Sequence, residues 1–130
     1  MGSQQKRSLK TVVGEDTYAV WTEMLRRLVP SSRTHRLAPL IAGMLHYATD
    51  IAYEKYGGKP EEGTVEHALL SASEMYDSDE VYSDLIDIVA GLFEDAGVEY
   101  ERVSSRGEGY SIAERIFYEF IHWYDMPWEG

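Results

Sequence analysis

Carboxylate side chains recur at helical spacing in the middle of the chain, beside apolar residues. Glu62 and Glu66 are four residues apart, and Glu80, Asp84 and Asp87 follow at spacings of four and three. In a helix these spacings place side chains on one face, with the three later acids within roughly 60° of one another. Mg²⁺ prefers such carboxylate oxygens, together with water and substrate phosphates. The pattern therefore predicts a magnesium site built by two successive helices.

The same acids have a simpler interpretation as a charged helical surface. Residues 59–101 hold thirteen acidic side chains and one base, Lys59, so this third of the chain has a formal net charge of −12. A surface of one sign attracts cations and basic partners. The alternative hypothesis is thus a non-enzymatic interaction protein that docks a basic partner or mimics nucleic acid.

Two segments resemble motifs of the all-α nucleoside triphosphate pyrophosphohydrolases, the MazG-like superfamily. That family carries a glutamate pair and a further glutamate on one helix, then Glu-x-x-Asp and an apolar run on the next. Residues 59–69, KPEEGTVEHAL, resemble the first motif, and residues 84–92, DLIDIVAGL, resemble the second. The chain departs from the pattern in having Asp84 for the usual glutamate and one extra residue between Glu62 and Glu66.

The resemblance covers residues 37–96 and implies Mg²⁺-dependent cleavage of a nucleoside triphosphate to the monophosphate and pyrophosphate. It implies that the metal is held by four carboxylates, with two further acids nearby. The four are Glu62, Glu66, Asp84 and Asp87, and the further acids are Glu61 and Glu80.

Two histidines have neighbours at helical spacing. His46 and Asp50 are four residues apart, which predicts a pair on the polar side of a helix. Arg115 precedes His122 by seven residues, two helical turns, and this pair resembles the arginine and histidine of small helical RNases of the HEPN type. The acidity of the chain disfavours RNA as a substrate, so this remains a third hypothesis.

Composition limits the class of protein. The chain has 130 residues, a net charge of −11, 44% hydrophobic residues and no cysteine. This length suits one domain. The lack of cysteine excludes disulfides, thiolate metal sites and cysteine nucleophiles. No apolar run reaches the roughly 20 residues of a membrane span, and the first residues lack the apolar core of a secretory signal, so we expect a cytoplasmic protein.

Charge is unevenly distributed. Residues 1–36 carry seven bases against three acids, whereas the middle of the chain is strongly negative. We expect residues 1–14 to form a disordered basic arm and residues 15–130 to form a single helical domain. The acidity disfavours binding to nucleic acid and leaves a nucleotide or a basic protein as the expected partner.

Hydrophobic periodicity predicts an all-α fold, a compact bundle of about five helices. The expected helices cover residues 16–29, from between 34 and 39 to 56, a segment within 60–76, a segment that follows the break at 77–80 and runs to 96, and 111–124. At most a short extended segment or hairpin is expected near residues 98–110. Capping-box spacings at Asp77–Glu80 and Ser111–Glu114 support the starts of the last two helices.

The first expected helix places Tyr18, Trp21, Met24, Leu25 and Leu28 on one apolar face. The last has a wide apolar arc, which with ten Tyr and three Trp predicts a homodimer or larger assembly. The sequence leaves the enzyme and the interaction protein open as alternatives.

Overall fold

The computed structural model describes residues 8–28, 34–57, 59–74, 79–98 and 115–120, with residues 34–36 and 79 described by their backbone alone. Within these ranges the chain is helical and forms no strand, so the predicted all-α bundle is confirmed. The helices are α1 (Lys10–Val13), α2 (Glu15–Leu28), α3 (Thr34–Tyr56), α4 (Val65–Glu74) and α5 (Asp79–Asp95), and residues 115–120 form a further helical segment.

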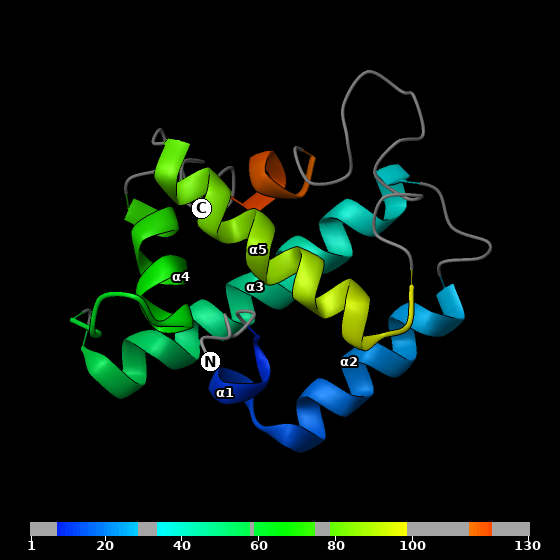
Figure 1. The fold of residues 1–130 in the computed structure, drawn as a ribbon, viewed down its shortest axis with the longest axis horizontal. Coiled ribbons are helices and arrows are strands. Elements are labelled where there is room, and N and C mark those ends of the chain that lie inside the picture. The colour runs from blue at the N-terminus through cyan, green and yellow to red at the C-terminus, as the bar shows by residue number, and fades with distance from the viewer. Residues whose placement is uncertain (1–7, 29–33, 58, 75–78, 99–114, 121–130) are drawn as a thin grey trace, which may run out of the picture.

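The longest helix, α3, organises the others. It spans the width of the molecule in Figure 1, where α2 lies toward one end, α4 toward the other, and α5 crosses in front. The backbones of α3, α4 and α5 pack in sequence, while α2 packs closely on α1 and α5. Residues 115–120 pack on α5, where the rings of Tyr82 and Phe117 meet edge to face at 4.9 Å.

The core follows the predicted helical stripes of α3 and α5. Their inward side chains recur at spacings of three and four and are almost completely buried, because each helix has one apolar face to remove from water. Fully buried members of the core are Leu37, Ile41, Leu45, Leu85, Ile88, Leu92 and Phe93. Phe120 is also fully buried, so part of the wide apolar arc of the last helix is used inside the molecule.

The N-terminal segment is partly folded. The prediction of a disordered arm over residues 1–14 is wrong from residue 8 onward, because Lys10–Val13 forms α1 and the side chains of Leu9 and Val12 enter the core. A short apolar pair is enough to attach this turn to α2, α3 and α4. Residues 1–7 lie outside the described residues.

The starts of α3 and α4 agree with the predicted ranges. α3 begins at Thr34, within the predicted 34 to 39, and Pro39 lies inside the helix, beyond its first turn. Proline has no N–H, so the carbonyl of His35 loses its ordinary intrahelical donor. The helix predicted within residues 60–76 is α4, Val65–Glu74, and lies inside that range.

The last residue of α5 is Asp95, one residue before the predicted end at residue 96, and Gly97 follows it. Gly97 has a φ of +77°. The amide of Val98 donates to the carbonyl of Phe93 at 3.0 Å, and the amide of Gly97 donates to the carbonyl of Glu94 at 3.0 Å. These two bonds are a Schellman motif, which requires a left-handed residue and so favours glycine. Asp77, Ser111 and Glu114 of the expected capping boxes lie outside the described residues, and so does the extended segment expected near 98–110, apart from Val98.

Candidate functional site

Exposed carboxylates cover the turn before α4 and the surfaces of α4 and α5. We call this group the acidic surface; its exposed members are Glu61, Glu62, Glu74, Glu80, Asp87, Glu94 and Asp95. Lys59 is the only base within residues 59–74 and 79–98. The described part of the sequence-predicted acidic stretch is therefore a surface of one sign.

The predicted pairing of Glu62 with Glu66 on one helical face is wrong. Gly63 has a φ of +88°, which breaks the chain direction before the helix begins. Thr64 then caps α4: its hydroxyl accepts a hydrogen bond from the amide of His67 at 3.1 Å and donates one to the carbonyl of Glu61 at 2.7 Å. Glu62 therefore lies in an exposed turn, not one helical turn before Glu66.

Glu66 is the buried carboxylate of this region. It lies in the first turn of α4 with 7% of its surface exposed. The hydroxyl of Tyr56, from the end of α3, donates to Glu66 Oε2 at 3.3 Å. The negative charge of Glu66 raises the pKa of Tyr56. The positive end of the α4 dipole also favours a carboxylate at this position.

The three predicted acids of α5 differ in exposure. Glu80 and Asp87 are exposed and Asp84 is half-buried, all three on one side of the helix as their spacing predicts. The first turn of α5 thus carries acid where the helix dipole favours it.

These residues do not fit a preformed magnesium site. Among the described side chains, no three histidine, aspartate or glutamate residues come close enough to hold one metal ion. Glu62 and Glu66 are separated by the turn at Gly63, and Glu66 Oε2 accepts a hydrogen bond from the hydroxyl of Tyr56. We therefore derive no catalytic step through a metal from this arrangement.

The remaining predicted pairs have mixed outcomes. His46 Nδ1 lies 3.8 Å from Asp50 Oδ2 on α3, which confirms the predicted surface pair. Arg115 begins the helical segment 115–120 and is half-buried, while His122 lies outside the described residues, so the predicted Arg115–His122 pair stays a prediction.

Tyrosine hydroxyls bind two carboxylates at the ends of helices, a feature that the sequence did not reveal. Tyr18 of α2 donates to Asp95 Oδ2 of α5 at 2.6 Å, and Tyr53 of α3 donates to Glu74 Oε2 of α4 at 2.6 Å. Burial, followed by the bond to Asp95, raises the pKa of Tyr18, and the bond to Glu74 raises that of Tyr53. Tyr18 and Asp95 are 77 residues apart, so no local spacing could have indicated the contact.

An open apolar groove lies between α2 and α3, on a different part of the molecule from α4. The ring of Trp21 meets that of Tyr47 edge to face at 6.0 Å across the two helices. The groove has a volume of about 410 Å³ and is lined by Thr17, Trp21, Met24, Pro39, Leu40, Gly43, Met44 and Tyr47. The sequence predicted Trp21 and Met24 on one helical face with Tyr18 and Leu25; both are half-buried, pack against the core and also line this groove.

Family models, curated protein sequences and solved structures were compared with the chain, and none matches it. The resemblance to the MazG-like superfamily therefore stays a prediction. No helix among the described residues combines the length and the apolar character needed to cross a membrane.

Proposed function

We propose that this chain is an interaction protein whose acidic surface docks a basic partner, a protein or peptide segment rich in lysine and arginine. The observation that carries the proposal is the single sign of α5. This helix holds six acids and no base over seventeen residues, and α4 holds two acids and no base. A surface designed for helix stability alone would mix both signs, since i,i+4 pairs of opposite charge stabilise a helix.

The C-terminal turn of α5 adds to this argument. Glu94 lies in that turn, which contains no base. The helix dipole is negative at this end, so a carboxylate there costs roughly 0.3–1 kcal/mol. An acid kept where the dipole disfavours it is consistent with a surface kept for binding.

The acids are also spread out, as docking requires. Glu61 and Glu62 precede α4, whereas Glu74 ends it, and ten helical residues rise by roughly 15 Å. A basic segment in extended or helical form can contact such a row at several points. Each exposed contact is expected to contribute a fraction of a kcal/mol and to weaken as salt screens it.

The test is binding of a synthetic lysine- and arginine-rich peptide, measured by fluorescence anisotropy over a range of salt concentrations. The triple variant Glu61→Gln, Glu62→Gln, Asp87→Asn removes three exposed charges from the acidic surface. We expect about a tenfold loss of affinity at low salt, and a smaller loss near 0.15 M, where the Debye length is about 8 Å.

A control variant separates a docking surface from net charge. Glu15→Gln with Asp50→Asn and Glu54→Gln also removes three exposed charges, but from α2 and α3. This control is expected to change affinity by less than about twofold, because its charges lie away from the docked segment. Equal losses in the two variants would show that the peptide responds only to total charge, and would refute the proposal.

A pyrophosphohydrolase remains the second candidate, and burial of Glu66 is the observation in its favour. A carboxylate 7% exposed is unusual for a purely solvated acidic face. Pyrophosphate release from a panel of nucleoside triphosphates with Mg²⁺ tests it directly. Release that Glu66→Gln abolishes, while a melting scan shows the variant folded, would favour the enzyme over the docking protein.

A further inference from the structure

The face formed by α2 and α3 combines exposed apolar side chains with little net charge. Val20 is 58% exposed, Tyr47 51% and Leu28 38%, and half-buried Trp21 and Met24 lie between them. The groove already described runs along this face. Apolar surface gathered in this way on a soluble domain marks an interaction site more often than chance.

Charge identifies the kind of partner. The chain has a net charge of −11, but α2 carries three acids and two arginines, and α3 carries two acids and two bases. Two copies that met through α5, with its six acids, would repel each other strongly. The α2–α3 face is where two copies of this chain can approach with the least repulsion.

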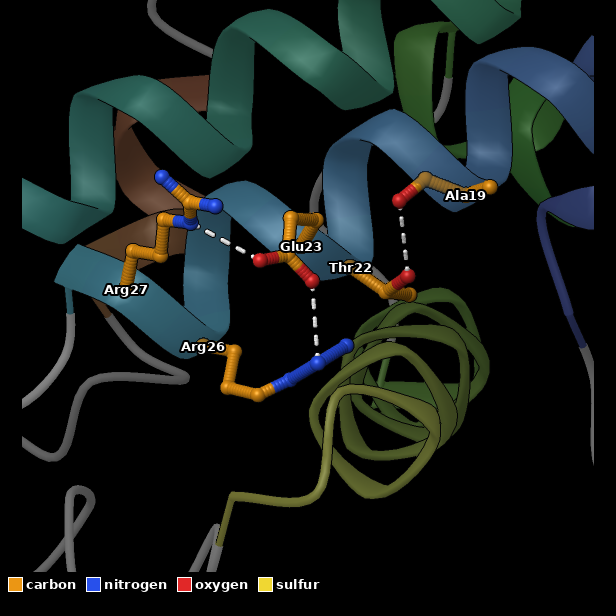
Figure 2. Close-up of polar contacts among 5 residues, drawn as sticks. All are labelled: Ala19, Thr22, Glu23, Arg26 and Arg27. Carbon is orange, nitrogen blue, oxygen red and sulfur yellow. Dashed lines mark hydrogen bonds and ion pairs between the residues drawn. The ribbon is translucent and has the colours of Figure 1, made fainter.

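The charges of α2 are also ordered along its length. Glu15 and Asp16 occupy its first turn, and Arg26 and Arg27 its last. Figure 2 shows the carboxylate of Glu23 between both arginines, 2.9 Å from Arg26 Nη1 and 2.8 Å from Arg27 Nε. When two such helices pack antiparallel about a two-fold axis, the acidic first turn of each lies beside the basic last turn of the other, and their dipoles also oppose.

The position of Val20 fits this arrangement. Asp16, Val20, Glu23 and Arg27 follow one another at spacings of four, three and four, so they form one stripe along α2. Val20 lies near the middle of that stripe and next to the groove-lining residues. In an antiparallel pair the middle of the stripe is the part furthest from solvent.

We infer that the chain forms a homodimer in which α2 packs antiparallel against α2 of a second copy, with the α2–α3 groove in the interface. Trp21 and Met24 form the apolar part of the interface, and Val20 of each copy lies beside Glu23 of the other. Asp16 of each copy lies near Arg27 of the other. The two-fold axis makes two such pairs, one at each end of the paired helices.

Sedimentation velocity of the full chain tests the interface. We expect a dimer at tens of micromolar. Val20→Asp places a second carboxylate beside Glu23 of the other copy, in both symmetric positions, and should raise the dimer dissociation constant at least about tenfold. Ala19→Asp is the matched control: it adds the same charge at the adjacent exposed residue, which points away from the groove, and should change the constant by less than about twofold.

Charge reversal tests the antiparallel orientation. Arg27→Glu or Asp16→Arg alone should raise the dimer dissociation constant by about fivefold, because each substitution places two like charges next to each other in both symmetric pairs. The double variant should recover the wild-type constant to within about twofold. Melting temperatures of all variants, measured where each is monomeric, show that they fold.

Three results would overturn the inference: a wild-type monomer at 50 µM or about that concentration, equal effects of Val20→Asp and Ala19→Asp, or a double reversal no tighter than the single ones. The test is independent of the acidic surface, because none of these substitutions lies on α4 or α5.

Discussion

The hydrogen bond between Tyr18 and Asp95 should make a measurable contribution to stability, and Tyr18→Phe isolates it. Tyr18 is 5% exposed, and its hydroxyl donates to Asp95 Oδ2 at 2.6 Å, joining the start of α2 to the end of α5. Phenylalanine keeps the buried ring and removes only the hydroxyl. The variant therefore reports on the bond and not on the packing of the ring.

The expected magnitude follows from the surroundings of both partners. A hydrogen bond to a charged group contributes roughly 1.5–3 kcal/mol, and more is lost when a charge is left buried without a donor. Asp95 is exposed, so water can hydrate its carboxylate once the hydroxyl is gone. We expect the lower end of that range, about 1.5 kcal/mol, which for a domain of this size lowers the melting temperature by about 6 °C.

The pH dependence distinguishes this bond from a general packing effect. Folding raises the pKa of Tyr18 above the ordinary value near 10, through burial and then the bond to Asp95. A group whose pKa is raised in the folded state stabilises it fully below the unfolded pKa, and this stabilisation is lost as the pH rises toward the folded pKa. The difference between wild type and Tyr18→Phe should be constant from pH 7 to about 9 and shrink above about pH 10.

Urea unfolding followed by circular dichroism at several pH values supplies the assay, with Tyr53→Phe as the control. Tyr53 also donates to a carboxylate at 2.6 Å, but it is 38% exposed, so its loss should cost less than about 0.5 kcal/mol. Equal costs for the two variants, or a Tyr18→Phe difference that is independent of pH up to 11 or about that value, would refute the reasoning.

Five further substitutions at four positions test local features of the fold by urea unfolding at neutral pH. Thr64→Ala should cost about 1 kcal/mol, because it removes the cap on the amide of His67, whereas Thr64→Ser should restore most of it. Gly63→Ala should cost about 1 kcal/mol, because Gly63 has a positive φ. Gly43→Ala, inside α3 with open space at the added methyl, should stabilise the protein by about 0.5–1 kcal/mol. A change of the same sign in the free energy of unfolding for both variants would contradict this reasoning. Asp87→Asn should stabilise by a few tenths of a kcal/mol, since it removes one like charge from α5, and a clear loss of stability would show that Asp87 has a structural partner.

The sequence specified the helices well where one side of a helix is uniformly apolar. The stripes of α3 and α5 were predictable because their buried residues recur with the helical period, and Gly97 marked a stop that only a left-handed residue can make. The apolar face of α2 is wider than the core can cover completely. Tyr18 and Leu25 are buried, Trp21 and Met24 pack against the core but stay half-exposed, and Leu28 is 38% exposed.

The site was harder to predict because its geometry depends on one turn and on long-range contacts. The spacing of Glu62 and Glu66 implied a helical pair, yet Gly63 and Thr64 between them carried the signal of a helix start. A threonine followed three residues later by an amide that it can cap competes directly with continuation of the helix toward its N-terminus. A helix that starts at this cap leaves Glu62 outside α4.

The tyrosine contacts divide the acids into two groups that the sequence could not distinguish. Glu66, Glu74 and Asp95 accept hydrogen bonds from tyrosines of other helices, so these carboxylates hold α2 to α5 and α3 to α4. Their negative charge is part of the fold, and its removal should cost stability. Neutralising Asp87, by contrast, is expected to raise the stability of the protein. Charge that costs folding energy and contacts no tyrosine is the charge most available to a basic partner, and for this reason Asp87 belongs in the docking test and Asp95 does not.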